Sequence, residues 1–414
     1  MKRCAILSCF VISIYCGVTV GCSGPTGSSQ ISGETAMSTV STAIATPATV
    51  ATTTSLAATS TTQVSSAELL LAGMTLRQKA AQVLLLAIDG TGLSAGTREL
   101  LAEGPPAGIL LLERNVTGAA QVLALTSALQ QAAVGLGSGM ELFIAVDQEG
   151  GPVQRLHEGV PEVPAARTLG EGSSPAEAGR LAAETAVGLL DLGVNMNLAP
   201  VADVVADKTS FLYRRTYGGN AALVVDFVTA ITEAFSQGGL ISVVKHFPGH
   251  GSASGDTHGE RVVSDATRTD FEAIHLPPFR AALAAGAEGV MMAHIVATAY
   301  DPERLASQSV SVIGGLLRGE LDFTGLVVAD DLEMTAAGSA ETGGGAATEG
   351  AAVAALQAGC DLLISTGTLA RQLQVLGAIV EAVETGRLSP SRLDEAVLQV
   401  LALKLRHGIV APPS

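Results

Sequence analysis

Short apolar runs alternate with amphipathic stretches from about residue 67 to the end of this 414-residue chain. The runs are rich in Val, Ile, Leu and Met and are bounded by glycine or polar residues, a pattern typical of buried strands in a parallel sheet. Eight such runs, separated mostly by helical patterns, predict a single-domain (β/α)8 TIM barrel of the α/β class. The predicted strands are residues 83–88, 108–112, 142–146, 194–198, 241–244, 289–292, 325–329 and 361–364.

Helix signals support this alternation. Thr75, followed three residues later by Gln78, forms a capping-box pattern, and Ser174 with Glu177 forms another. A last amphipathic helix is predicted to begin at residue 391. A further helix has four apolar residues at helical spacing and ends at a glycine pair, so it has one apolar face. These residues are Val224, Val228, Ile231 and Phe235, with Gly238 and Gly239.

The segment after the fifth predicted strand concentrates reactive side chains. It reads KHFPGHGSASGDTHGE over residues 245–260 and contains three of the seven histidines. Pro248 and the glycines on either side of His250 favour an ordered loop over a helix. In a TIM barrel the reactive groups lie at the carboxyl ends of the strands, so this loop is a candidate active site.

Three interpretations of this loop compete. His246, His250, His258 and Asp256 are ligand types that zinc accepts, but Pro248 prevents the helical geometry that a His-x-x-x-His pair would need. The histidines could instead only satisfy buried backbone groups. The favoured interpretation is acid/base catalysis, because the Asp256 carboxylate can orient the His258 imidazole two residues away. We therefore expect no metal and no cofactor.

The N-terminus predicts export. A basic start followed by an apolar run is typical of a secretory signal peptide over residues 1–21. Residues 18–22, VTVGC, resemble a bacterial lipobox, which predicts cleavage before Cys22 and a lipid on its sulfur. The rest of residues 22–66 is rich in Ser, Thr and Ala and predicts a disordered linker, with the barrel domain spanning 67–414. The expected location is extracytoplasmic, anchored to the membrane by lipid.

The charge and cysteine content of the chain limit the kinds of partner and the covalent links that we expect. The net charge is −16, and loss of the signal peptide would leave 21 basic against 39 acidic residues, so a nucleic-acid partner is not expected. Only Cys22 and Cys360 would remain in the mature chain, and Cys360 lies in an apolar run that predicts a core position and no disulfide. We expect a monomer.

The loop sequence KHFPGHGSASGDTHGE resembles the signature of the β-N-acetylglucosaminidase branch of the family 3 glycoside hydrolases, and DQEGGPVQRL at residues 147–156 resembles the sugar-binding loop of that family. The resemblance covers roughly residues 70 to 408. It implies that Asp256 and His258 form the acid/base pair. Pro152 stands where the family usually has arginine, and Arg214 next to Arg215 offers a second possible match. The substrate ligands that it implies are Asp147, Arg155, Arg215, Lys245 and His246.

Two adjacent aspartates, Asp330 and Asp331, follow the seventh predicted strand. Neighbouring residues of an extended chain point to opposite sides, so only one of them can face the pocket, and periodicity does not choose between them. The family resemblance implies that Asp330 is the nucleophile, because it directly follows the strand and precedes the x-Leu-x-Met pattern. His294 also matches a strand end of the family, without an implied role.

The function that follows is an exo-acting, retaining β-N-acetylglucosaminidase that removes terminal β-linked N-acetylglucosamine from glycans or muropeptides, with peptidoglycan fragments as the expected source. Asp330 would attack the anomeric carbon, and His258 with Asp256 would serve as acid and base. The alternatives are a glycoside phosphorylase of the same fold and a non-catalytic sugar-binding lipoprotein.

Overall fold

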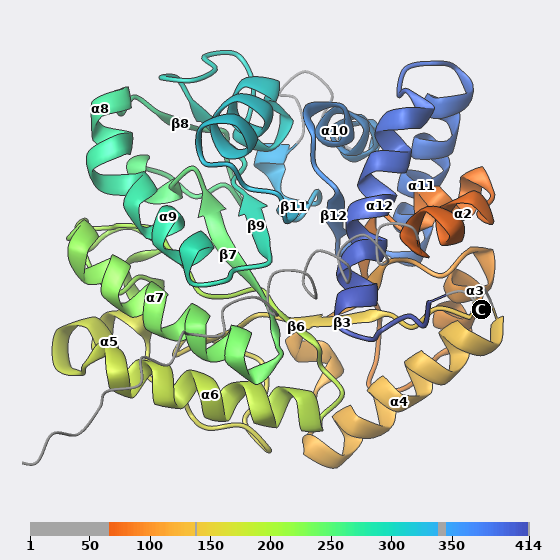
Figure 1. Cartoon of the computed structure of the whole chain (residues 1–414), viewed down its shortest axis with the longest axis horizontal. Helices are drawn as coiled ribbons and strands as arrows, with labels where there is room; N and C mark the ends of the chain where they lie inside the picture. Colours follow the sequence, from red (N-terminus) through yellow and green to blue (C-terminus); the bar gives the residue numbers. More distant parts are fainter. Residues whose placement is uncertain (1–65, 137–138, 338–344, 413–414) are drawn as a thin grey trace, which may run out of the picture. The chain divides into compact units, whose positions relative to one another are not determined.

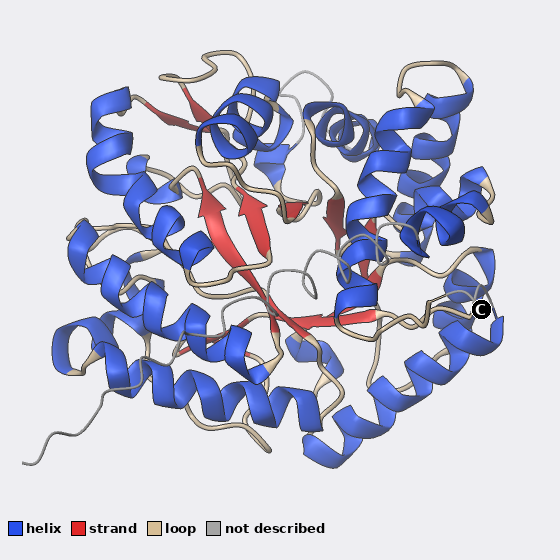
Figure 2. Cartoon of the chain, in the orientation of Figure 1, coloured by secondary structure: helices blue, strands red, loops and turns tan. Residues whose placement is uncertain are grey.

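The computed structural model describes residues 66–136, 139–337 and 345–412. The predicted signal peptide, Cys22 and all but the last residue of the predicted linker lie outside these ranges. The described part contains a closed barrel of eight parallel strands whose neighbours follow one another along the chain, and β1 closes the barrel against β12. Figures 1 and 2 show the strands in the middle of the surrounding helices. This confirms the predicted TIM barrel. The strands are β1 (Leu84–Ala87), β2 (Gly108–Leu111), β3 (Phe143–Val146), β6 (Met196–Asn197), β7 (Ile241–Phe247), β9 (Gly289–Met292), β11 (Leu326–Ala329) and β12 (Leu362–Ser365).

Helices surround the strands, as Figure 2 shows. The α-helices are α2 (Leu76–Ala81), α3 (Ala95–Glu103), α4 (Ala119–Leu136), α5 (Ala166–Gly172), α6 (Pro175–Asp191), α7 (Ala221–Gly238), α8 (Arg268–Asp270), α9 (Leu276–Ala284), α10 (Gly345–Ala358), α11 (Leu369–Glu384) and α12 (Pro390–Arg406). Shorter or π-helical segments are η1 (Glu113–Asn115), η2 (Tyr213–Arg215), η3 (His250–Ser252), η4 (Phe271–His275), η5 (Ala306–Gln308), η6 (Ser311–Glu320) and η7 (Thr335–Ala337). Two small sheets, β4 (Gln148–Gly150) with β5 (Val153–Gln154) and β8 (Val262–Ser264) with β10 (Ile295–Ala297), lie outside the barrel strands.

The strands are buried on both faces because their side chains alternate between two apolar layers. Leu85, Val243 and Val328 belong to the layer that fills the inside of the barrel. Val244 and Ala329 belong to the larger layer between strands and helices. The alternation has a period of two residues, so the residue two positions after an inward residue also points inward unless the strand is irregular. This parity positions the polar residues at the strand ends.

The predicted helix signals are mostly confirmed. Thr75 and Gln78 form the complete capping box of α2. Ser174 caps α6 by accepting from the Glu177 N–H, but the Glu177 carboxylate binds Arg180 instead of closing the box. The four-residue apolar stripe of α7 is buried, and Gly239 ends that helix with φ 76°. The last helix, α12, begins one residue before the predicted position.

Two strand predictions need correction. The fourth strand is limited to Met196–Asn197, shorter than the predicted 194–198. The fifth strand, β7, continues to Phe247 because its backbone still pairs with β9 at that residue. Lys245 and His246 therefore lie within the strand and do not follow it. The segment after it is a loop, as predicted, with one 3-10 turn at His250–Ser252.

Among the described helices, α4 is the one that is long and apolar enough to cross a membrane, judged by length and composition alone. One side of α4, with Val122, Leu125 and Leu129, belongs to the apolar layer between strands and helices. Packing against the barrel therefore accounts for this side of α4, whereas Leu123, Val134 and Leu136 of the same helix are exposed.

Candidate active site

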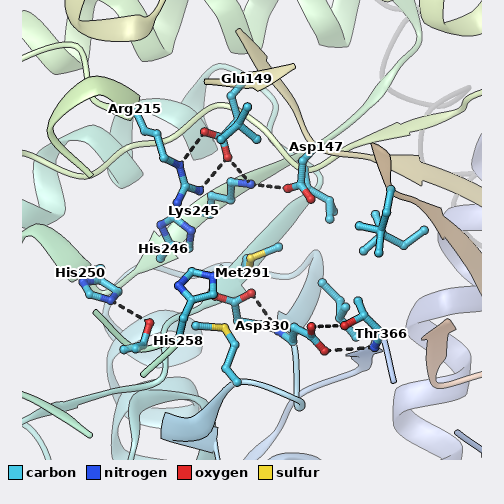
Figure 3. A pocket seen from close by; sticks show the side chains of 18 of the residues that line it. Asp147, Glu149, Arg215, Lys245, His246, His250, His258, Met291, Asp330 and Thr366 are labelled. Atoms are coloured by element: carbon cyan, nitrogen blue, oxygen red, sulfur yellow. Dashed lines mark hydrogen bonds and ion pairs between the residues drawn. The ribbon is translucent and has the colours of Figure 1, made fainter. Parts of the chain in front are cut away.

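A cavity of about 400 Å³ opens at the carboxyl ends of the barrel strands (Figure 3). Its lining combines apolar residues from inside the barrel with a dense set of charged and polar side chains. Every site residue predicted for the barrel, except Asp256, lines this cavity. The polar lining residues are Asp147, Glu149, Arg155, Arg215, Lys245, His246, His250, Thr257, His258, Asp330, Asp331 and Thr366.

Strand parity brings several of these residues inward. Asp147 is two residues after Ala145, and Lys245 is two residues after Val243, and both apolar residues belong to the inner layer. His246 has the opposite parity, but an irregularity in the pairing between β7 and β9 lies just at this point. Such irregularities turn side chains to a new direction, which explains why His246 also reaches the cavity.

A buried ion cluster forms one wall of the cavity. The Lys245 Nζ atom lies 2.6 Å from Asp147 Oδ1 and 2.7 Å from Glu149 Oε1. Arg215 donates to both carboxylate oxygens of Glu149, from Nε at 2.9 Å and from Nη2 at 2.8 Å. The side chains of Lys245 and Glu149 are only 2% and 3% exposed, so these pairs are shielded from water. Removing one charged side chain of this cluster would leave its partner as an uncompensated buried charge.

The charges in this cluster hold one another ionised. Burial alone would raise the pKa of Glu149, but the positive charges of Arg215 and Lys245 outweigh burial and hold that pKa well below its ordinary value. Burial alone would lower the pKa of Lys245, but Asp147 and Glu149 reverse the effect and raise it. The wall therefore offers fixed charges that do not reorganise when a ligand enters.

Arg155 lies on the loop after β3 and lines the cavity, as predicted. Its backbone N–H donates to Gln148 Oε1 at 3.0 Å, which fixes the loop. Its Nε atom is buried and has no hydrogen-bond partner among the described residues. A buried guanidinium donor without a partner is costly, so this position suits a group that accepts a hydrogen bond from Arg155.

Asp203 orients His246. The His246 Nδ1 atom lies 2.7 Å from Asp203 Oδ2, and the backbone N–H of His246 donates to the same oxygen. Asp203 is fully buried, and its other oxygen accepts the N–H of Gly251 at 3.1 Å. Although burial would raise the pKa of Asp203, its bonds to His246 and Gly251 lower it. This carboxylate therefore fixes the imidazole and the turn that follows β7 together.

Asp256 and His258 form the predicted pair. The His258 Nδ1 atom lies 2.6 Å from Asp256 Oδ1, and that oxygen also accepts the His258 backbone N–H at 3.0 Å. The side chains are 62% and 49% exposed for His258 and Asp256, and the pKa of Asp256 is lowered because the bonds to His258 outweigh partial burial. With Nδ1 bound to the carboxylate, the Nε2 atom of His258 is available for proton transfer.

Asp330 is the second carboxylate of interest. It has the parity of the inner-layer residue Val328, and its Oδ1 atom accepts the N–H of Asp331 at 2.8 Å. Burial alone would raise its pKa, but His246 and the other positive or donor groups around it lower the value. Figure 3 shows the Asp330 and His258 side chains in the same cavity. A carboxylate that is ionised at neutral pH is suited to nucleophilic attack.

Asp331 has a different environment, although it also lines the cavity. Its carboxylate accepts hydrogen bonds from the Thr366 hydroxyl, the Thr366 N–H and the Glu333 N–H. Burial raises its pKa to about 6 despite these bonds. The sequence implies no role for His294. In the structure its Nδ1 atom lies 2.8 Å from the Ser307 hydroxyl, and its Nε2 atom lies 3.2 Å from the Asp331 carbonyl. Asp331 and His294 therefore fix the backbone around Asp330.

The three histidines of residues 245–260, one in β7 and two in the loop after it, have three separate partners. His246 binds Asp203, His250 binds Thr257 and His258 binds Asp256. In the part of the chain that the structure describes, no group of three or more His, Cys, Asp or Glu side chains is arranged to hold a metal ion. Within the described ranges, Cys360 has a free, buried thiol, as predicted for a core position. Its Sγ atom lies 3.4 Å from the Ser307 carbonyl.

Sequence reasoning missed two residues that organise the site. Glu149 stands in the DQEGGPVQRL segment two residues after Asp147, a spacing that could give both side chains the same direction. Asp203 is a single carboxylate inside an apolar run after a strand, a pattern that signals a buried charge with a specific partner. The partners of both residues are distant in sequence, so their roles emerge only in the fold.

Comparison with known proteins gives a consistent result. The family model described as "Glycosyl hydrolase family 3 N terminal domain" matches residues 75–403. A β-hexosaminidase from Nitrosomonas eutropha is 33% identical over 323 residues, which cover 76% of this chain and 90% of the relative. A β-hexosaminidase from Xylella fastidiosa is 36% identical and covers 68% of this chain and 82% of the relative.

Solved structures agree with these relatives. A family 3 β-N-acetylglucosaminidase from Paenibacillus sp. FPU-7 superposes with a TM-score of 0.77 at 38% identity and covers 83% of this chain, which spans 64% of that longer protein. A β-N-acetylhexosaminidase from Beutenbergia cavernae superposes with a TM-score of 0.71 at 29% identity, covering 80% and 98% of the two chains. This chain is therefore a glycoside hydrolase and belongs to glycosyl hydrolase family 3.

Proposed function

We propose that this glycoside hydrolase is an exo-acting, retaining β-N-acetylglucosaminidase. The observation that carries the proposal is that one cavity joins an ionised, partly buried carboxylate, Asp330, to the imidazole of His258. A second observation is the fixed charged wall built on Glu149, which suits hydrogen-bonding hydroxyls of a sugar. The relatives named β-hexosaminidase and β-N-acetylglucosaminidase support the choice of an N-acetylated sugar.

In the first step, the Asp330 carboxylate attacks the anomeric carbon and the glycosidic bond breaks. His258 Nε2 gives its proton to the leaving oxygen, while Asp256 stabilises the imidazolium. A covalent bond now joins the sugar to Asp330. In the second step, neutral His258 takes a proton from water, the water oxygen attacks the same carbon, and the sugar leaves with its original configuration. A carboxylate and an imidazole thus share the work that two carboxyl groups perform in most retaining glycosidases.

The substrate contacts follow from the lining. Asp147 and Lys245 present a carboxylate and an ammonium group to the cavity, Arg215 lies against Glu149, and His246 is held by Asp203. Arg155 has an unsatisfied buried N–H for an acceptor on the sugar. These groups recognise hydroxyl positions of a terminal N-acetylglucosamine unit and hold it beside Asp330.

The experiment is hydrolysis of an aryl β-N-acetylglucosaminide by the full chain, with proton NMR of the first product to read its anomeric configuration. We expect the β anomer to form first and Asp330→Ala to lower kcat roughly 10⁴-fold or more. An initial α product would exclude retention. Full activity of Asp330→Ala would exclude this nucleophile, and product formation only with added phosphate would identify a phosphorylase.

The source of the substrate and the location are part of the same proposal. The predicted signal peptide and Cys22 would place the barrel outside the cytoplasm on a lipid anchor, where peptidoglycan fragments are the N-acetylglucosamine-containing material at hand. Incorporation of labelled palmitate into the full chain, compared with Cys22→Ala, tests the anchor. Release of N-acetylglucosamine from purified muropeptides tests the source. Equal labelling of both proteins would reject lipidation at Cys22.

A further inference from the structure

Thr257 lies between the two exposed residues of the acid/base pair, but its own environment is opposite to theirs. It is 1% exposed, whereas the side chains on either side of it are about half exposed or more. Its hydroxyl lies 3.1 Å from His250 Nε2. A hydroxyl can donate or accept, so this bond forms with either tautomer of a neutral imidazole.

The carbonyl of Thr257 makes a second contact, on another element. It accepts the N–H of Ala336 at 3.2 Å. Ala336 belongs to η7 (Thr335–Ala337), in the loop that begins with Asp330 after β11. Thr257 therefore connects the acid/base loop to the loop of the proposed nucleophile, in addition to the turn after β7.

His250 provides a rigid base for this connection. It is 2% exposed, and burial lowers its pKa, so the ring is neutral. Phe211 packs edge-on against it with ring centroids 5.2 Å apart, and the next residue, Gly251, is held by the buried carboxylate of Asp203. A continuous set of contacts thus runs from the barrel wall through His250 to Thr257.

We infer that Thr257 and His250 are positioning residues, which hold the acid/base loop where the His258 imidazole can reach the leaving oxygen. The inference rests on the proposed acid/base role of His258. The pair Asp256 and His258 is too exposed to fix its own position, because exposed ion pairs contribute little ordering free energy. The buried residue between them supplies that order.

The test measures kcat/KM for β-N-acetylglucosaminides with a good leaving group, 2,4-dinitrophenol, and a poor one, methanol. Thr257→Val keeps the shape and removes the hydroxyl. We expect it to lower kcat/KM roughly tenfold or more for the methyl glycoside and less than about threefold for the dinitrophenyl glycoside, because only a poor leaving group needs the proton. Thr257→Ser should restore most of the loss.

The matched control is Thr232→Val on α7, a fully buried threonine whose hydroxyl has no hydrogen-bond partner among the described residues. It should change neither rate by more than about twofold, since the buried hydroxyl makes no interaction to lose. His250→Phe combined with Thr257→Val should lose little more than either change alone, because both break the same contact.

Two outcomes separate this inference from the proposed function. If His258→Ala shows the leaving-group dependence and Thr257→Val does not, the positioning role is wrong and the acid/base role stands. If His258→Ala shows no such dependence, the acid/base proposal itself fails. An equal loss on both substrates in Thr257→Val, with a lowered Tm, would assign Thr257 a structural role only.

Discussion

The two charged regions of the cavity differ in how far their side chains are buried. In the charged wall, the side chains of Lys245 and Glu149 are 2% and 3% exposed and those of Arg215 and Asp147 are 15% and 18% exposed. In the other region, Asp256 and His258 are 49% and 62% exposed. Both regions pair acidic with basic side chains at hydrogen-bond distance. In the proposed function, this difference separates recognition, which needs fixed charges in a dry site, from proton transfer, which needs contact with water and the leaving group.

The same difference predicts how each region is linked to folding. Removing a charge from the buried wall leaves its partners without compensation, so folding and binding fail together. Removing a charge from the exposed pair costs little folding free energy, so only the chemistry changes. Stability and activity measured on the same variants can therefore test the comparison.

The largest effect is expected for Glu149→Gln. The amide keeps the shape but leaves Arg215 and Lys245 facing each other with only Asp147 to balance them, and we expect a loss of about 3–5 kcal/mol of unfolding free energy together with most of the activity. Urea unfolding measures the loss. The matched control is Glu162→Gln, which breaks an exposed pair with His157 and should change stability by less than about 0.5 kcal/mol. Equal effects of the two changes would refute the comparison.

Asp256→Asn should affect activity and leave folding unchanged. The amide no longer stabilises an imidazolium at His258, so turnover of a poor leaving group should fall about 100-fold. The Tm should stay within about 2 °C of the wild type. Asp207→Asn, an exposed aspartate whose carboxylate binds only Thr209 among the described residues, is the control and should keep full activity. A stability loss in Asp256→Asn like that of Glu149→Gln would contradict the assignment of this loop to chemistry alone.

Asp331 offers a pH-dependent test on the Asp330 side of the cavity. Its pKa in the folded protein is raised from 3.8 to about 6, so between these values the folded state holds a proton that the unfolded state has released. The contribution of this group to stability therefore falls as pH rises from about 4 to 6. Asp331→Asn removes that dependence, and its stability relative to wild type should improve by about 1–2 kcal/mol across this range. A difference that stays constant with pH would show that the Asp331 carboxylate is not perturbed by burial.

The smallest effect is expected for Arg155→Met, which keeps the apolar stem and removes the unpartnered donor. The free energy of unfolding should not fall, because the Nε atom makes no hydrogen bond among the described residues and its removal relieves an unsatisfied buried donor. We expect KM for the aryl glycoside to rise about tenfold, corresponding to one charged hydrogen bond to the sugar. An unchanged KM would remove Arg155 from the set of substrate ligands.

Particular residues show how far sequence reasoning reaches. The eight strands and their order follow from local apolar patterns, and the position of Asp147 follows from the end of one of them. The choice between Asp330 and Asp331 did not follow from periodicity alone. In the structure Val328 faces the inside of the barrel, and Asp330, two positions later, shares that direction, which supports the proposal of Asp330 as the nucleophile. The expectation that only one of the two aspartates faces the pocket is wrong, because both line the cavity.

The sequence by itself determined the barrel, the loop that carries Asp256 and His258, and the residue types that the chemistry needs, because these depend on spacing along one segment. The tertiary structure decided which charges are paired. Glu149 meets Arg215, Asp203 meets His246 and His294 meets the Asp331 carbonyl across gaps of 37 or more residues. Burial depends on every neighbour in space, so only the folded barrel separates a charged wall from an exposed proton-transfer loop.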